Sequence, residues 1–141
     1  MSFREKRAWV TLITLIVLLI LFLGHFPPPR TLTPDSSMFV LHVMMLMLVT
    51  FVVVEIVAHV VFMIRSPRDA RTPKDERERL IELKSIAIAW YVYAILSIGG
   101  VFVTIHLGAN VIGLGFVVLM AFVIAEIVNY ALRIFYYRRG F

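Results

Sequence analysis

Four long apolar blocks dominate the chain, and short polar segments separate them. The blocks cover about residues 8–24, 38–64, 85–106 and 111–135. A helix needs about 20 apolar residues to cross a hydrocarbon core of roughly 30 Å, and each block is close to that length. The pattern therefore predicts an all-α membrane protein with four transmembrane helices.

Composition supports this prediction and leaves no room for a second domain. Of the 141 residues, 61 % are hydrophobic and 16 % are charged, and the mean hydropathy is +0.93. Soluble domains are about half apolar and about a quarter charged. We therefore expect a single transmembrane bundle over residues 1–141, with a first helix pair at 1–64, a charged cytoplasmic linker at 65–84 and a second helix pair at 85–141.

The ends of the blocks carry further local signals. The first block follows a basic lead, as in a signal peptide, but no small-residue cleavage pattern comes after it, so we expect a retained helix. The run Thr72-Pro73-Lys74-Asp75 predicts a helix start with Thr72 as the cap. The mixture of Leu and Ile with charged residues that follows predicts an amphipathic, interfacial lead into the third span.

The basic residues predict the orientation in the membrane. Three precede the first span, seven lie in residues 65–84 and three lie in residues 133–139, whereas only Arg30 lies on the other side. Short loops with such a bias stay in the cytoplasm, so we expect both termini there. The net charge of +5 then reflects topology and contact with anionic lipid, and we expect no nucleic-acid partner.

The two halves of the chain resemble each other. The heptapeptide that contains Glu55 matches the one that contains Glu126, and Trp9 matches Trp90 in the preceding block. Such residues are scarce in membrane spans, so their matches favour a duplication. Units of two spans point the same way, which predicts a parallel tandem repeat of two helix pairs about a pseudo-two-fold axis along the membrane normal. That arrangement would bring the two glutamates to a common centre at similar depth.

Glu55 and Glu126 are the only acids within the apolar blocks. They precede Arg65 and Arg133 by 10 and 7 residues, which places them roughly 10–15 Å inside the cytoplasmic boundary at about 1.5 Å per residue. An ionised and unpaired carboxylate there costs several kcal/mol, so we expect each group to be protonated, hydrogen-bonded or wetted.

Other polar side chains share the faces of these two acids. His59 lies four residues after Glu55, and Tyr130 lies four residues after Glu126 with Asn129 beside it. We predict a polar cluster that binds a proton or a cation, made of Glu55, His59, Glu126, Asn129 and Tyr130. The alternative is a hydrogen-bonded clamp that only fixes the packing of the helices.

Metal and cofactor chemistry is not expected. Glu55, His59 and Glu126 could offer three ligands, but the Glu-x-x-His spacing is missing and Tyr130 stands where a second His would be needed. The histidines do not offer two haem ligands that face each other at one depth. The methionines of the second block are better explained as apolar packing than as copper ligands. There is no cysteine, phosphate-binding loop or nucleophile motif, so we expect no enzyme activity.

Small residues predict a close helix contact in the third span. Gly100, Thr104 and Gly108 recur every four residues, which is typical of closely packed membrane helices. The first block is by contrast rich in Leu and Ile, with Thr11 and Thr14 as its polar residues, so we expect most of it to face lipid.

Three short motifs suggest a family. The segments are Arg4-Glu5-Lys6-x-Ala8-Trp9, Asp75-Glu76-Arg77 and Tyr137-Arg138-Arg139-Gly140. Together they resemble a pattern of small, uncharacterised four-helix membrane proteins of bacteria, a domain of unknown function. The resemblance implies the bacterial cytoplasmic (inner) membrane and the topology above, and it implies no activity. The chain differs from small multidrug exporters, whose essential Glu lies in the first helix.

Two functional hypotheses follow. The first is a small proton- or cation-linked transporter whose paired intramembrane glutamates form the working site, in a homo-oligomer, most simply a dimer. The second is a non-catalytic membrane scaffold or regulatory subunit that binds a protein partner through the charged linker at 65–84.

Overall fold

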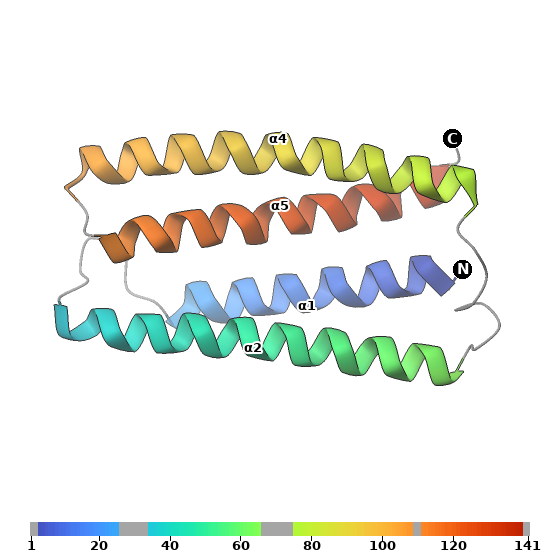
Figure 1. The fold of residues 1–141 in the computed structure, drawn as a ribbon, viewed down its shortest axis with the longest axis horizontal. Coiled ribbons are helices and arrows are strands. Elements are labelled where there is room, and N and C mark those ends of the chain that lie inside the picture. The colour runs from blue at the N-terminus through green and yellow to red at the C-terminus, as the bar shows by residue number, and fades with distance from the viewer. Residues whose placement is uncertain (1–2, 26–33, 66–74, 109–110, 140–141) are drawn as a thin grey trace.

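The computed structural model describes residues 3–25, 34–65, 75–108 and 111–139. Within them the chain forms four α-helices, α1 (Phe3–His25), α2 (Pro34–Arg65), α4 (Glu76–His106) and α5 (Val111–Arg139), as Figure 1 shows. Each helix is long and apolar enough to cross a membrane. The prediction of an all-α chain with four candidate spans is confirmed.

The charged start of α4 forms one helix with the apolar span that follows it. Asp75 caps the helix, since its carboxyl accepts from the Glu76 N–H at 2.8 Å and its own N–H donates to Glu78 at 3.2 Å. The helix then runs without a break to His106. The amphipathic segment is therefore a coaxial extension of the span, and its charged side chains reach neighbouring helices. Thr72, the predicted cap, lies outside the described residues.

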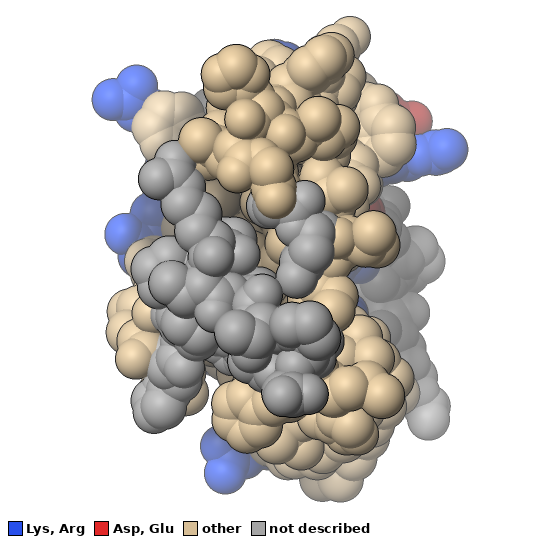
Figure 2. All heavy atoms as spheres, turned by 90° about the vertical axis from the view of Figure 1, so that its left-hand side faces the viewer, with Lys and Arg blue, Asp and Glu red and all other residues tan. Residues whose placement is uncertain are grey.

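The helices stand side by side in the order α2, α1, α5, α4, and neighbours are antiparallel (Figure 1). The start of α1, the end of α2, the start of α4 and the end of α5 lie at one end, which we call the basic end. Figure 2 looks onto the opposite end, where the described atoms facing the viewer belong to uncharged residues and the Lys and Arg atoms appear only at the rim.

This order makes α1 and α5 the inner helices. The buried share of the apolar span is 28 % in α1 and 22 % in α5, against 6 % in α2 and in α4. The first helix therefore has the largest buried share of the four, although most of its span is not buried. A pseudo-two-fold axis would equate α1 with α4 and α2 with α5, so the α1–α5 contact would require an α4–α2 counterpart. Instead α2 and α4 lie at opposite edges, and the predicted repeat is not visible in the packing.

The inner pair is packed along its length. Near the basic end, Ala8 and Leu12 of α1 form a buried cluster with Ile134 of α5. Toward the opposite end, the rings of Phe22 and Phe116 stack with their centroids 5.1 Å apart. Lipid is as apolar as these side chains, so the contact is stabilised by van der Waals packing rather than by removal from water.

One of the three predicted small residues, Gly100, brings α4 against α5, and Thr104 bonds to it within α4. A Cβ on Gly100 would overlap a methyl group of Val117 on α5, and the buried Thr104 hydroxyl donates to the Gly100 carbonyl at 2.6 Å. Gly108 has a different role. It has φ +69° and open space around it, so it supplies the left-handed conformation that ends α4.

We expect Gly100→Ala to destabilise the protein relative to Gly99→Ala. Both changes raise the helix propensity by the same amount. The methyl group introduced at position 100 overlaps Val117, whereas the space around Gly99 is open. Overpacking of this kind costs about 1–3 kcal/mol. Apparent thermal unfolding midpoints in detergent, followed by near-ultraviolet circular dichroism, measure the difference. Equal midpoints for the two variants would contradict the close α4–α5 contact.

Candidate functional site

Glu55 lies on α2 and its carboxyl group meets α1. The Thr11 hydroxyl, which is 1 % exposed, donates to Glu55 Oε2 at 3.1 Å and also lies 3.3 Å from the Arg7 carbonyl oxygen. The single hydroxyl hydrogen of Thr11 faces both oxygens, so this hydroxyl links the Glu55 side chain of α2 to the backbone of α1.

The rest of this site has unused hydrogen-bonding capacity. Glu55 Oε1 and His59 Nδ1 are both buried, and neither has a hydrogen-bond partner among the described residues. They lie one helical turn apart on the same face of α2. A buried polar atom without a partner costs about 1–3 kcal/mol, so the protein maintains this arrangement against its own stability. Such a cost is typical of a site that receives a ligand or a proton.

Tyr130 of α5 lies close to both glutamates. Its ring packs against the cluster of Ala8, Leu12 and Ile134, and the Arg133 guanidinium lies 5.0 Å from the ring centroid. The charged groups within electrostatic reach of its hydroxyl come from three helices: Arg7 of α1, Glu55 of α2, and Glu126 and Arg133 of α5.

Glu126 has very different surroundings from Glu55. Its Oε2 accepts from Asn129 Nδ2 at 3.2 Å, and Asn129 Oδ1 in turn accepts from Arg133 Nε at 3.1 Å. Arg133 Nη1 then pairs with Glu82 Oε1 of α4 at 3.3 Å. We call these four residues the α4–α5 network. Every member has a named partner, and the Asn129 side chain is buried.

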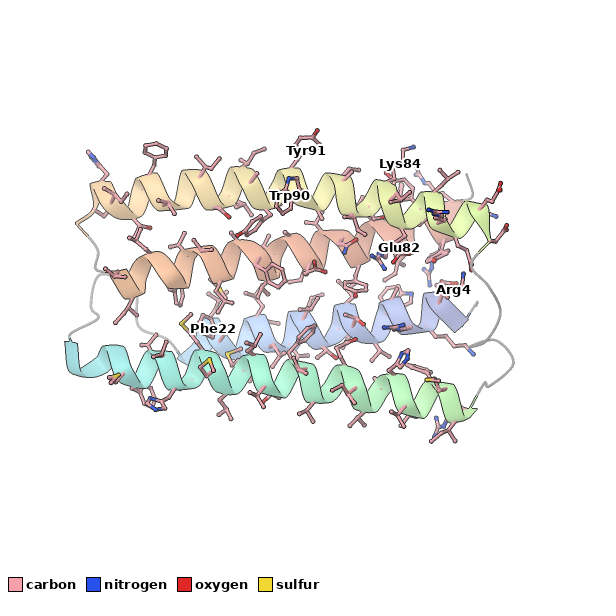
Figure 3. All side chains as sticks on the ribbon, viewed as in Figure 1. Arg4, Phe22, Glu82, Lys84, Trp90 and Tyr91 are labelled. Atoms are coloured by element: carbon pink, nitrogen blue, oxygen red, sulfur yellow. The ribbon has the colours of Figure 1, made fainter. Side chains whose placement is uncertain are left out.

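Further ion pairs join the helices at the basic end. Arg4 of α1 pairs with Glu78 of α4, and Glu5 of α1 pairs with Arg138 of α5 at 3.3 Å. The Arg138 guanidinium also lies 5.3 Å from the Trp9 ring centroid. Figure 3 shows Arg4, Glu82 and Lys84 gathered toward this end. Partly exposed pairs contribute up to about 1 kcal/mol each, so their main effect is to hold the helix ends in register.

The residues of the predicted cluster have different partners in the structure. Glu126 and Asn129 belong to the α4–α5 network, Glu55 bonds Thr11 of α1, and Tyr130 lies within electrostatic reach of both glutamates. Sequence reasoning missed Thr11, Arg133 and Glu82 as members. Thr11 is one of two polar residues in an apolar block, and Arg133 follows Asn129 by four residues. Both positions could therefore have been predicted as members of the site. Among the described residues, no three His, Asp or Glu side chains gather closely enough to hold a metal ion.

The fold and the site define an integral membrane protein with four candidate spans whose helices contact the lipid bilayer. Comparisons with protein families, with characterised proteins and with solved structures give no match. The four long apolar helices agree with the four-helix membrane architecture that the sequence motifs suggested, and no family is identified.

Proposed function

We propose that this protein is a small proton- or cation-linked transporter in which Glu55 is the group that exchanges a proton. The observation that carries the proposal is the half-buried Glu55 side chain. Its Oε2 accepts from Thr11, while its Oε1 atom is buried without a described partner, as is Nδ1 of the half-buried His59. A fully bonded clamp would leave neither atom in that condition. Intramembrane acids of this kind commonly mark proton or ion pathways.

Glu126 has a supporting role in this proposal. Its network joins α5 to α4 and holds Tyr130 beneath the Arg133 guanidinium, near Glu55. The pair of glutamates therefore divides into a group that exchanges a proton and a group that positions the helix next to it. Transport of this kind requires no chemical conversion, in line with the expectation that the protein is not an enzyme.

The location and the oligomeric state of the transporter are part of the proposal. We place the protein in the bacterial cytoplasmic membrane with the basic end in the cytoplasm, as the Lys and Arg distribution favours. We also propose a homodimer, because the outer helices α2 and α4 are only 6 % buried and Tyr91 of α4 points away from α5 (Figure 3). A second copy would cover the exposed face of an outer helix.

The scaffold hypothesis keeps one supporting observation. The α4–α5 network is fully partnered, as a packing clamp requires. A protein partner would then bind near the charged linker at 65–84, of which residues 66–74 lie outside the described residues.

Proton flux in proteoliposomes decides between the two hypotheses. An internal pH dye reports the decay of an imposed pH gradient for wild type, for Glu55→Gln and for empty vesicles. We expect flux in the wild type and only the empty-vesicle leak in Glu55→Gln. Equal flux above the leak in both proteins, at equal reconstitution, would remove Glu55 from the mechanism. Flux no greater than the empty-vesicle leak in both would favour the scaffold.

A further inference from the structure

The methionines in the first half of α2 fall into two groups. Met44 and Met47 line an apolar pocket between α1, α2 and α5, so they pack against other helices as the sequence predicted. Met38 and Met45 are instead 63 % and 57 % exposed on the surface of α2. Filling of gaps between helices therefore explains the first group and leaves the second without a packing role.

The two exposed methionines flank His42, whose side chain is also exposed. Met38 precedes His42 by four residues and Met45 follows it by three, so all three lie on one face of α2. Neighbours at these spacings have Cβ atoms about 5–6 Å apart. Helical side chains lean toward the N-terminus, which directs Met45 over the turn of His42, and His42 over the turn of Met38. Two thioether groups and one imidazole are therefore near enough to share a small ion.

The His42 ring is held with one nitrogen left for a ligand. Its Nδ1 lies 2.6 Å from the Met38 carbonyl oxygen. A carbonyl oxygen only accepts, so Nδ1 carries the hydrogen, and the lone pair of the neutral ring is on Nε2. Histidines that bind metals have the same arrangement, in which the second nitrogen donates to a carbonyl or a carboxylate. This contact fixes both the tautomer and the orientation of the ring.

The three side chains lie toward the end of the bundle opposite the basic end, where α2 begins (Figure 1). A hydrocarbon core of roughly 30 Å takes about 20 residues of helix. Counted from Arg65 at the basic end, the core extends to about Met45. Met38 and His42 therefore lie in the interfacial layer beyond it, and Met45 lies at its edge. An ion can reach this position from water.

We propose that Met38, His42 and Met45 bind one Cu(I) ion through the two thioether sulfurs and Nε2 of the imidazole. Thioethers are soft ligands that select Cu(I), whereas Mg²⁺, Ca²⁺ and Mn²⁺ prefer carboxylate, carbonyl and water oxygens. All three ligands are neutral, so binding transfers no proton and no electron and leaves a single positive charge. Met45 precedes Glu55 by 10 residues, about 15 Å along the helix. The copper site is therefore separate from the proposed proton site and goes beyond the proposed function.

The methyl ¹³C resonances of the methionines test this site in the whole protein in lipid nanodiscs. The probe is Ag(I), which is diamagnetic, resists redox chemistry and prefers the same soft ligands. We expect Ag(I) to shift the Met38 and Met45 signals together until one ion is bound per chain. The Met63 signal should stay in place, because Met63 is 45 % exposed on the same helix but has no exposed His beside it. Mg²⁺ should move none of these signals.

Competition with a coloured Cu(I) chelator, under reductant and without oxygen, compares the affinities of variants. Wild type, Met63→Leu and Glu55→Gln should each take one Cu(I) per chain from the chelator. The double variant with Met38→Leu and Met45→Leu, and the single variant His42→Gln, should bind more weakly by about tenfold or more. Leu is close to Met in volume, so the double variant should remain folded.

Four results would overturn the inference. The first is a Met63 signal that shifts with the same midpoint as those of Met38 and Met45, which would show unselective binding to exposed thioethers. The second is wild-type Cu(I) affinity in the double variant or in His42→Gln. The third is a loss of Cu(I) affinity in Glu55→Gln, which would place the ion at the proton site. The fourth is the absence of any Ag(I)-induced shift in the wild-type protein.

Discussion

Replacing Arg133 by Gln should lower the stability of this protein more than any other single change at the basic end. Arg133 lies on α5, donates to Asn129 and pairs with Glu82 of α4, and its side chain is only 18 % exposed. Breaking a fully buried pair costs about 3–5 kcal/mol. Glu82 is 28 % exposed, so solvent screening reduces the expected cost to about 1–3 kcal/mol.

A double-mutant cycle shows whether this loss comes from the pair itself. Glu82→Gln removes the partner charge, so adding it to Arg133→Gln should recover part of the lost thermal stability. The thermal stability of Arg133→Lys should lie between those of wild type and Arg133→Gln. An ammonium group can pair with Glu82 but cannot form the two-directional hydrogen bonds of a guanidinium group. Arg139→Gln is the exposed control and should leave the midpoint near wild type. Additive losses in the cycle would show that the α4–α5 network is not coupled.

Glu→Gln changes at the two intramembrane acids should affect different properties, proton flux for Glu55 and thermal stability for Glu126. Glu55→Gln removes the exchangeable proton, and its amide can still bond Thr11, so flux should fall by about tenfold or more with little change in the unfolding midpoint. Glu126→Gln can still accept from Asn129, so it should keep most of the flux and lose about 0.5–1.5 kcal/mol of stability. Flux assays and thermal unfolding on the same two preparations measure this. Similar profiles for the two variants would favour the symmetric site that the sequence suggested.

The helices were predictable because the bilayer restricts the backbone so severely. Every N–H and C=O in a span must bond within the chain, so an apolar run such as that between Met38 and Arg65 has few alternatives to a helix. The bounds were less predictable at the basic end. A charged segment such as Glu76 to Lys84 is compatible with either a helix or a loop. The capping contacts of Asp75 fix the residue at which α4 begins.

The site was only partly predictable, for a reason of geometry. Spacing along one helix placed Asn129 and Tyr130 with Glu126, because residues three and four apart share a face. The contact between Thr11 and Glu55 depends on which helix lies next to α2. The residue pattern within a single helix does not predict which helices are neighbours. The repeat of Glu55 and Glu126 suggested equivalent environments, but the row α2, α1, α5, α4 gives one carboxyl group a Thr partner and the other an Asn–Arg network.

Infrared spectroscopy of the protein in lipid tests the central claim most directly, because a protonated carboxyl group has its own carbonyl band. Spectra recorded across a pH series for wild type, Glu55→Gln and Glu126→Gln show which acid exchanges a proton inside the membrane. Every Asp and Glu gives such a band at low pH, so the readout is the difference between the spectra of wild type and of each variant. We expect a component of the band that disappears as the pH rises in wild type and in Glu126→Gln, and that is absent from Glu55→Gln. An unchanged band in Glu55→Gln would contradict the account.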